Sequence, residues 1–398
     1  MRISVLVCLC LFVQLAVAQE KKYPFVNYAE NVIYHGKDSS DMLGFYKKMN
    51  DYLQGREKEL VVAHVGGSHV QGGFWGDELT YKFQSLKKTE GSGFFAFPYK
   101  QVKTNSPPWY KTFSDGKWKR CRSATIRELC ADFGIAGITA TTNDSANTFG
   151  IKIDTCRHHH TFNSVKIFHN FNPSFIIEPG IKARRNDFPG AGYSEFIFEK
   201  QVDSIGFSLV RKDTLQKDFV LYGFDVRNTQ KPGVYYAALG ANGASTQSVL
   251  RCRLFTQQMA VIKPDLVIFS LGVNDVQDKF FSSDEFIAHY DTLVSWVKAA
   301  SPGCAVLFTT ITDNYVKRRK ANNKSNTVEY CIQKLMHKHN AAMWDMYGVM
   351  GGYKSILKWY KAGYARKDRV HFTARGYYIF ADLMFDALMK SYRYNYPQ

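Results

Sequence analysis

Three short and nearly continuous apolar segments set the strongest limit on the fold of this chain. They span residues 60–65 (LVVAHV), 266–271 (LVIFSL) and 305–310 (AVLFTT). None shows the strict alternation of a strand with one wet face, so each is typical of a parallel strand that helices cover on both faces. Segments with apolar residues at helical spacing occur between and after them, at 284–299, 328–336 and 374–390. This order predicts an α/β fold with a parallel sheet between helical layers.

The middle of the chain follows a different pattern. From residue 105 to residue 234 the helical spacing fades, and short runs rich in β-branched and aromatic residues appear, such as 204–210 and 219–224. Turn pairs such as Pro189-Gly190 and Pro232-Gly233 separate these runs. Short strands at regular spacing predict a β-sandwich. We therefore expect an inserted β-domain at 105–234 that divides the α/β domain into residues 19–104 and 235–398.

The N-terminus is typical of an export signal. Arg2 precedes an apolar run, and Ala16-Val17-Ala18 gives the small-x-small pattern that a signal peptidase cleaves. The run is too short for a membrane span, which needs about 20 residues. The sequence thus predicts a signal peptide at 1–18, cleavage after Ala18, no membrane span, and a periplasmic or extracellular protein.

The net charge indicates the class of binding partner, and the cysteine content indicates whether disulfides can form. The net charge of +17 favours acidic partners, and export argues against nucleic acid, so an acidic polysaccharide is the expected partner. Six cysteines follow the signal, and export permits disulfides among them. Cys121 and Cys130 are the favoured pair because they lie close in sequence. The run His158–His160 is more typical of a solvated segment than of a metal site, and we expect no metal.

Four short motifs carry candidate chemistry, and two of them follow predicted buried strands. Ser68 stands in Gly66-Gly67-Ser68-His69, directly after the strand at 60–65, where open α/β sheets bind their ligands. Asn274 follows the strand at 266–271 and can aim an amide N–H at the same point. Taken singly, each is also compatible with an ordinary turn.

The other two motifs complete a possible hydrolytic site. Gly243 stands in a loop after the apolar run 234–239 and can offer a bare backbone N–H to a substrate oxygen. Asp368 and His371 lie three residues apart before the last helix-like segment. At that spacing, the carboxylate can orient the imidazole while the other ring nitrogen takes a proton from Ser68.

Together, in this order, the four motifs resemble those of the SGNH hydrolase superfamily, also called GDSL-like esterases. The resemblance covers residues 61–76 and 235–388, and its most specific parts are 272–275 (GVND) and 368–373 (DRVHFT). It implies a three-layer α/β/α, flavodoxin-like domain and a catalytic triad of Ser68, Asp368 and His371. It also implies an oxyanion hole made by the N–H groups of Ser68 and Gly243 with the Asn274 side chain. No cofactor is expected.

One position departs from the family pattern. The first motif of the family usually reads Gly-Asp-Ser, and this chain carries Gly67 in place of the Asp. The layout, with a β-rich insertion after the first motif and a Gly-x-Ser-His first motif, resembles that of exported bacterial peptidoglycan O-acetylesterases. It therefore implies a serine carbohydrate O-acetylesterase acting on an acetylated, acidic polysaccharide. His69, Lys317, Arg318 and Arg319 are candidate substrate-binding residues.

Two functions from other classes remain open at this point. An inert carbohydrate-binding protein on the same fold would bind glycan and release no acetate. A glycan O-acetyltransferase would use the same triad, but it would pass the acetyl group to a sugar faster than to water.

Overall fold

The computed structural model describes residues 23–38, 40–87, 91–125, 132–154, 161–215 and 217–396. The predicted signal peptide, Cys130, Cys156 and the His158–His160 run lie outside these residues. Cys121 is disulfide-bonded, whereas Cys252 and Cys331 are free thiols; these two and Cys304 are buried. Across the described ranges, no helix combines the length and the apolar character that crossing a membrane requires.

The three apolar segments form the centre of a parallel sheet, as predicted. They are β2 (Leu60–Gly66), β15 (Leu266–Ser270) and β16 (Ala305–Thr309). The sheet also contains β19 (Ala342–Trp344), β14 (Val234–Gly240) and β3 (Gly91–Ala96), in the order β19-β16-β15-β2-β14-β3. All neighbours along this path are parallel, and β1 (Ile33–His35) adds an antiparallel edge at β19.

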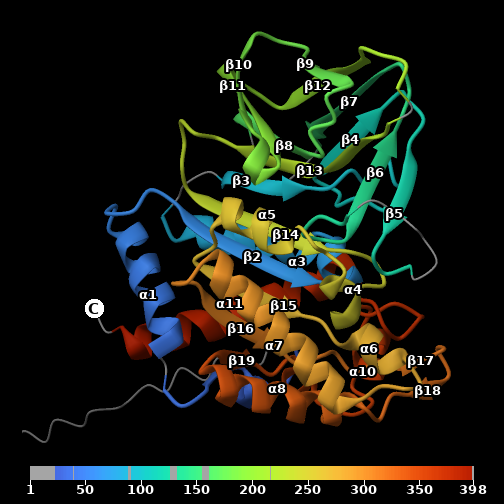
Figure 1. Cartoon of the computed structure of the whole chain (residues 1–398). Coiled ribbons are helices and arrows are strands. Elements are labelled where there is room, and N and C mark those ends of the chain that lie inside the picture. The colour runs from blue at the N-terminus through green and yellow to red at the C-terminus, as the bar shows by residue number, and fades with distance from the viewer. Residues whose placement is uncertain are drawn as a thin grey trace, which may run out of the picture.

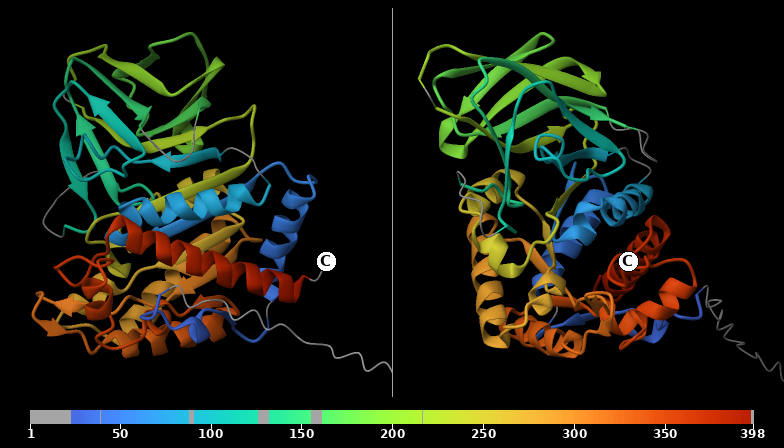
Figure 2. Two further views of the ribbon diagram at one scale, coloured as in Figure 1. Left: turned by 180° about the vertical axis from the view of Figure 1, so that it is seen from behind. Right: turned by 90° about the vertical axis from the view of Figure 1, so that its right-hand side faces the viewer.

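Helices cover both faces of this sheet because alternate residues of each strand enter different cores. In β2, Val61, Ala63 and Val65 belong to one hydrophobic cluster, while Leu60 and Val62 belong to the other. The first cluster includes residues of α5 (Phe255–Ile262), α7 (Ser283–Ala300) and α8 (Ser325–His339). The second includes residues of α1 (Ser40–Leu53), α3 (Phe74–Ser85) and α11 (Ala374–Asn395). Figures 1 and 2 show these two helical layers on opposite faces, which confirms the predicted three-layer α/β fold.

The parallel sheet and the β-rich middle of the chain share one continuous sheet. The two parts are joined where β13 (Phe219–Arg227) pairs with β3. This pairing is antiparallel and covers residues 93–96 and 224–227. Beyond β13 the large sheet continues through β8 (Phe162–His169), β11 (Tyr193–Val202) and β10 (Ala183–Phe188); β6 (Ile138–Thr142) also pairs with β13, and β5 (Lys119–Arg122) pairs with β6. A second sheet contains β4 (Tyr110–Ser114), β7 (Ala146–Ile153), β12 (Ser204–Arg211) and β9 (Phe175–Pro179). Two facing sheets match the predicted β-sandwich, which lies above the α/β part in Figure 1.

The strand order places a crevice at the carboxyl end of β2. The chain reaches β14 on one side of β2 and then crosses to β15 on the other side. In open α/β sheets, ligands bind at such a switch point, outside the carboxyl ends of the strands. The loops after β14, β2 and β15 therefore meet at one end of the sheet, and these loops carry Gly243, Ser68 and Asn274.

Candidate active site

Ser68 begins a short helix directly after β2. This helix, α2 (Ser68–Gln71), has Gly67 as its N-cap, and every residue of β2 before it is buried. The side chain of Ser68 is therefore held at the end of a rigid strand while its Oγ reaches the surface of the crevice. Ser68 Oγ lies 2.8 Å from Nε2 of His371, a hydrogen-bond distance.

Asp368 and His371 share a tight turn before α11. Asp368 Oδ1 accepts hydrogen bonds from the backbone N–H groups of Val370, at 3.0 Å, and His371, at 2.9 Å. Its Oδ2 lies 3.0 Å from His371 Nδ1. Arg369 adopts a left-handed conformation with φ of 57°, which turns the chain between the two residues. The turn therefore orients both the carboxylate and the imidazole.

The electrostatics of the turn favour an ionised Asp368. Partial burial raises the pKa of its carboxyl, but hydrogen bonds from the His371 and Val370 backbone and from the His371 ring bring that pKa below its ordinary value. A carboxylate on Nδ1 keeps that nitrogen protonated and leaves Nε2 free to accept the Ser68 proton. The structure thus brings Ser68, His371 and Asp368 into one hydrogen-bonded chain.

The loops after β14 and β15 are tied together beside Ser68. Asn274 donates through Nδ2 to the backbone oxygen of Ala244 at 2.8 Å, and one amide hydrogen remains for another acceptor. Asp275 Oδ1 accepts from both the backbone N–H of Thr246 at 3.0 Å and its hydroxyl at 2.5 Å. Gly243, directly before Ala244, is exposed and has a φ of 83°. That conformation suits Gly, and the predicted oxyanion role of Gly243 and Asn274 stays a prediction.

The other predicted binding residues lie away from the surface of the crevice. His69 is 8% exposed; its Nδ1 lies 3.0 Å from the Tyr377 hydroxyl, and its ring centroid lies 5.4 Å from that of His371. Burial, with a smaller contribution from His371, lowers the pKa of His69 to about 3, so the ring is neutral at pH 7. Lys317, Arg318 and Arg319 lie between β17 (Tyr315–Val316) and β18 (Lys320–Ala321), and all three are exposed at the surface.

A cavity of about 340 Å³ opens at Ser68 and His371. Its size is at the lower end of the range of about 300–1,000 Å³ for small-molecule sites. Its walls combine aromatic and other apolar side chains with amide and hydroxyl groups: Gln71, Phe74, Asn105, Ser106, Pro108, Asn242, Arg366, Phe372 and Tyr377. Apart from the two triad members, none of these residues was predicted. Only Gln71 had a sequence signal, since it stands three residues after Ser68 and therefore lies on the same face of α2.

Gln71 connects three segments around this cavity. Its Oε1 accepts the backbone N–H of Asn242, in the loop that carries Gly243. Its Nε2 donates to the backbone oxygen of Asn105 at 2.7 Å and to the Thr104 hydroxyl at 3.3 Å. Asn105 belongs to the segment that leads into β4. The β-rich part of the chain and α2 are thus fixed to each other at the rim of the cavity.

Gly67 allows a close approach of the Asn274 amide. A Cβ at residue 67 would lie 3.2 Å from Asn274 Nδ2 and 3.4 Å from the Ala244 oxygen. Since φ at Gly67 is negative, at −96°, an Ala there needs no left-handed backbone, and we expect Gly67→Ala to fold. It should displace the amide by a few tenths of an ångström and lower kcat roughly tenfold, less than the loss of a whole oxyanion donor. Ester-hydrolysis kinetics test this.

A matched substitution controls for the loss of glycine. Gly303 lies in the loop before β16, and a Cβ there would meet nothing within 4 Å. Gly303→Ala should therefore keep the wild-type kcat. An unchanged kcat in Gly67→Ala as well would show that the reaction does not depend on where the Asn274 amide lies.

Comparison with known proteins agrees with this geometry. Residues 213–379 match the model of the GDSL-like lipase/acylhydrolase family. No sequence among curated proteins matches the chain. The fold matches a solved peptidoglycan O-acetylesterase with a TM-score of 0.75 and 19% identity, over 91% of this chain and 99% of that one.

Two further solved structures match a smaller part of the chain. A lipase/acylhydrolase from Enterococcus faecalis covers 40% of this chain and 78% of its own, with 19% identity and a TM-score of 0.32. An acetyl xylan esterase covers 39% of this chain and 81% of its own, with 23% identity and a TM-score of 0.33. The family match confirms the predicted class of enzyme, a carboxylic ester hydrolase. The chain carries a domain of the GDSL-like lipase/acylhydrolase family.

Proposed function

We propose that this protein is an exported serine esterase that removes O-acetyl groups from peptidoglycan or another acidic cell-wall polysaccharide. The observation that carries the proposal is the hydrogen-bonded chain from Ser68 through His371 to Asp368, which opens directly into the cavity. The shared fold with a peptidoglycan O-acetylesterase supports the choice of substrate class.

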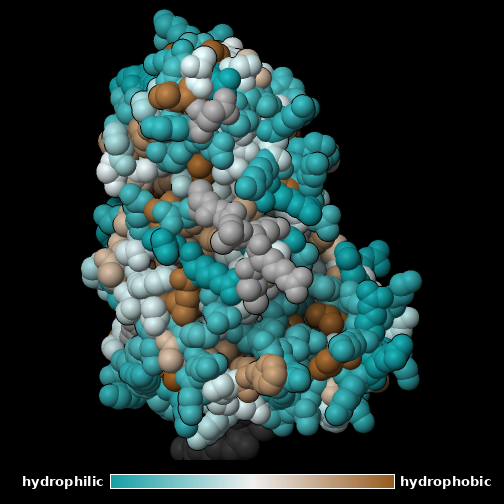
Figure 3. Space-filling view, turned by 45° about the vertical axis from the view of Figure 1, so that its right-hand side comes forward, coloured by the Kyte–Doolittle hydropathy of each residue, from teal (hydrophilic) through white to brown (hydrophobic). Residues whose placement is uncertain are grey.

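The shape and lining of the cavity fit a sugar better than a lipid chain. Phe74 offers aromatic surface at the cavity, and the exposed Asn105 offers an amide group that can bind hydroxyls. The surface on the side of α6 (Val273–Gln277), β17 and β18 is mostly hydrophilic, with small and separate hydrophobic spots (Figure 3). Asn105, Ser106 and Pro108 come from the segment that enters the β-rich part, which therefore forms one wall of the site.

The proposed reaction proceeds through an acetyl-enzyme. Ser68 Oγ attacks the ester carbonyl while its proton passes to His371 Nε2, and the oxyanion is held by the N–H groups of Ser68 and Gly243 with the Asn274 amide. The bond to the sugar oxygen then breaks, and His371 gives its proton to that oxygen. Water, deprotonated by His371, finally attacks the acetyl group and releases acetate.

Acetate release tests the substrate class. We expect the wild-type protein to release acetate from O-acetylated peptidoglycan faster than from O-acetylated xylan, and Ser68→Ala to release none from either. Base-treated polysaccharide, which carries no ester, provides the blank. Acetate release from neither polysaccharide by a protein that hydrolyses p-nitrophenyl acetate would reject the substrate class. Faster acetyl transfer to glycan than to water would instead indicate a glycan O-acetyltransferase.

A further inference from the structure

Arg366 is the one permanently charged side chain that lines the cavity at Ser68, among the described residues. The remaining lining is neutral except for the titratable His371. No acidic side chain of the described residues lines this cavity to balance the guanidinium. A cavity with a single fixed positive charge favours a ligand with a negative charge at that place.

The guanidinium of Arg366 has no ion-pair partner among the described residues. Its side chain is exposed, and the acid nearest to it in sequence, Asp368, is occupied by His371 and Val370. The positive charge of Arg366 acts on the Tyr377 hydroxyl, where it opposes the rise that burial causes in the pKa of that hydroxyl. Both Arg366 and Tyr377 line the cavity.

The backbone fixes Arg366 relative to the reacting atoms. Its N–H donates to the backbone oxygen of His371 at 2.8 Å, so the two residues move as one unit. In the proposed reaction, His371 protonates the leaving sugar oxygen, which requires the sugar half of the ester to lie on the His371 side. Arg366 therefore faces the sugar rather than the acetyl group.

On these grounds, and resting on the proposed esterase function, we propose that Arg366 binds a carboxylate of the sugar that is being deacetylated. Arg is suited to this task because its planar guanidinium binds carboxylates through two parallel hydrogen bonds. The site would then select acidic sugars, such as those with a lactyl or uronic carboxylate, over neutral ones.

The basic hairpin between β17 and β18 is a weaker source of this selectivity. Lys317, Arg318 and Arg319 do not line the cavity, and the backbone oxygen of Arg318 accepts a bond from Arg369 at 3.4 Å. Their charges lie in solvent, where salt screens them over about 8–10 Å. We expect them to contribute to general attraction of acidic glycans and not to the choice between an acid and its ester.

The test compares N-acetylmuramic acid with its methyl ester, which differ at pH 7 only in the charged group. Both are used as competitive inhibitors of p-nitrophenyl acetate hydrolysis. For the wild-type protein, we expect the acid to bind about tenfold more tightly than the ester. In Arg366→Gln this ratio should fall to about one, and Arg366→Lys should retain part of it, because it keeps the charge and loses the paired hydrogen bonds.

Two control variants separate Arg366 from overall charge. Lys367→Gln removes the same charge from the neighbouring exposed residue, which does not line the cavity, and should keep the wild-type ratio. A combined Lys317→Gln, Arg318→Gln and Arg319→Gln variant should keep it as well. Loss of the ratio in that variant together with its retention in Arg366→Gln would overturn the proposal and assign selectivity to the hairpin.

Failure of this inference can be told from failure of the esterase proposal. An active esterase that is inhibited equally by acid and ester, or by neither, overturns only the role of Arg366. If the wild type does not hydrolyse p-nitrophenyl acetate, the esterase proposal fails, and calorimetric titration of both sugars into Ser68→Ala still measures the preference. Equal affinities in that titration also overturn the role of Arg366.

Discussion

Ser68→Ala is expected to lower kcat for p-nitrophenyl acetate by at least about 10³-fold. The substitution removes the only atom of this side chain that can form the acetyl-enzyme, Oγ, which lies 2.8 Å from His371 Nε2. Only the oxyanion donors and substrate binding would then act on the ester, and they leave a small residual rate. Absorbance of the released p-nitrophenol follows the reaction.

The triad predicts a second result that a merely structural serine would not give. Because Ser68 and His371 act as one unit, the double variant Ser68→Ala, His371→Ala should be no slower than either single variant. Ser85→Ala provides the matched control, since Ser85 is exposed on α3 and its hydroxyl donates to the backbone oxygen of Tyr81 at 2.7 Å. Equal rates for the wild type and Ser68→Ala would show that Ser68 is not the nucleophile.

The central strands and the site motifs could be predicted because local sequence determines them. A continuous apolar run such as 60–65 can be satisfied only by a strand that is buried on both faces, and β2 is buried along its whole length. A polar residue directly after such a strand must lie at the carboxyl end of the sheet. These two rules led to Ser68 and Asn274 without knowledge of any contact between them.

The walls of the cavity and the joining of the sheets could not be predicted in this way. Asn105 reaches the site because Gln71 binds its backbone oxygen across 34 residues of sequence. The pairing of β13 with β3 joins segments that are more than 120 residues apart, and no local pattern specifies which edge strand a β-rich insertion will extend. No sequence pattern predicted a role for Arg366, because an exposed Arg in a turn is common. Its place at the cavity is visible only in the folded structure.

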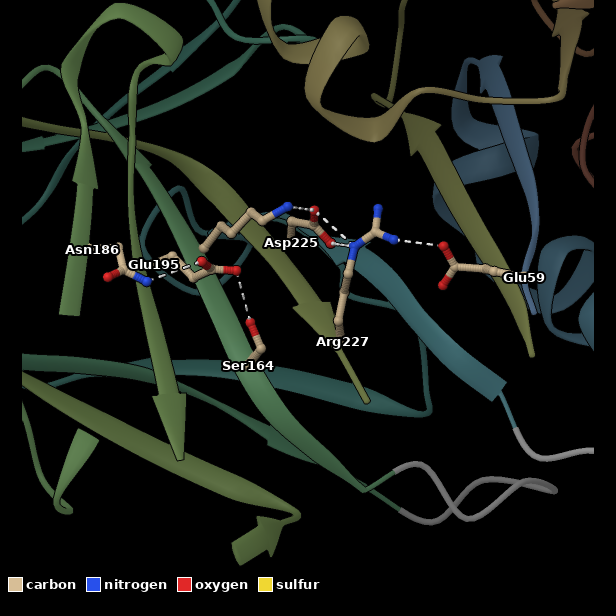
Figure 4. Close-up of polar contacts among 7 residues, drawn as sticks. Glu59, Ser164, Asn186, Glu195, Asp225 and Arg227 are labelled. Atoms are coloured by element: carbon tan, nitrogen blue, oxygen red, sulfur yellow. Dashed lines mark hydrogen bonds and ion pairs between the residues drawn. The ribbon is translucent and has the colours of Figure 1, made fainter. Parts of the chain in front are cut away.

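The second large effect concerns a buried ionic network between the two parts of the molecule (Figure 4). Arg227, at the end of β13, donates through Nε to Asp225 at 3.0 Å and through Nη1 to Glu59, just before β2, at 2.8 Å. Lys166 Nζ of β8 lies 3.5 Å from the other oxygen of Asp225, whose side chain is fully buried. The Arg227 guanidinium also lies 4.1 Å from the centre of the Tyr235 ring, at the start of β14.

We expect Asp225→Ala to lower the free energy of unfolding by about 3 kcal/mol, because it leaves the half-buried charges of Arg227 and Lys166 without their shared partner, while Arg227 keeps Glu59. Urea unfolding measures this loss. Replacing Asp225, Arg227 and Lys166 together by Leu, Met and Met should cost less than Asp225→Ala alone, since only Glu59 of the network then keeps a charge, and the Ser92 hydroxyl donates to it at 2.6 Å. As a surface control, Lys47→Ala removes the exposed pair with Asp51 and should change stability little.

The same variant separates stability from catalysis. The network lies at the amino ends of β2 and β14, whereas Ser68 and Gly243 follow their carboxyl ends. Below its unfolding transition, Asp225→Ala should therefore keep a kcat close to that of the wild type while unfolding at a lower urea concentration. A large fall in kcat in the folded variant would contradict this separation. It would show that the packing of the β-rich part affects the geometry of the triad through β2. An unchanged urea midpoint would instead show that the network is not what holds the two parts together.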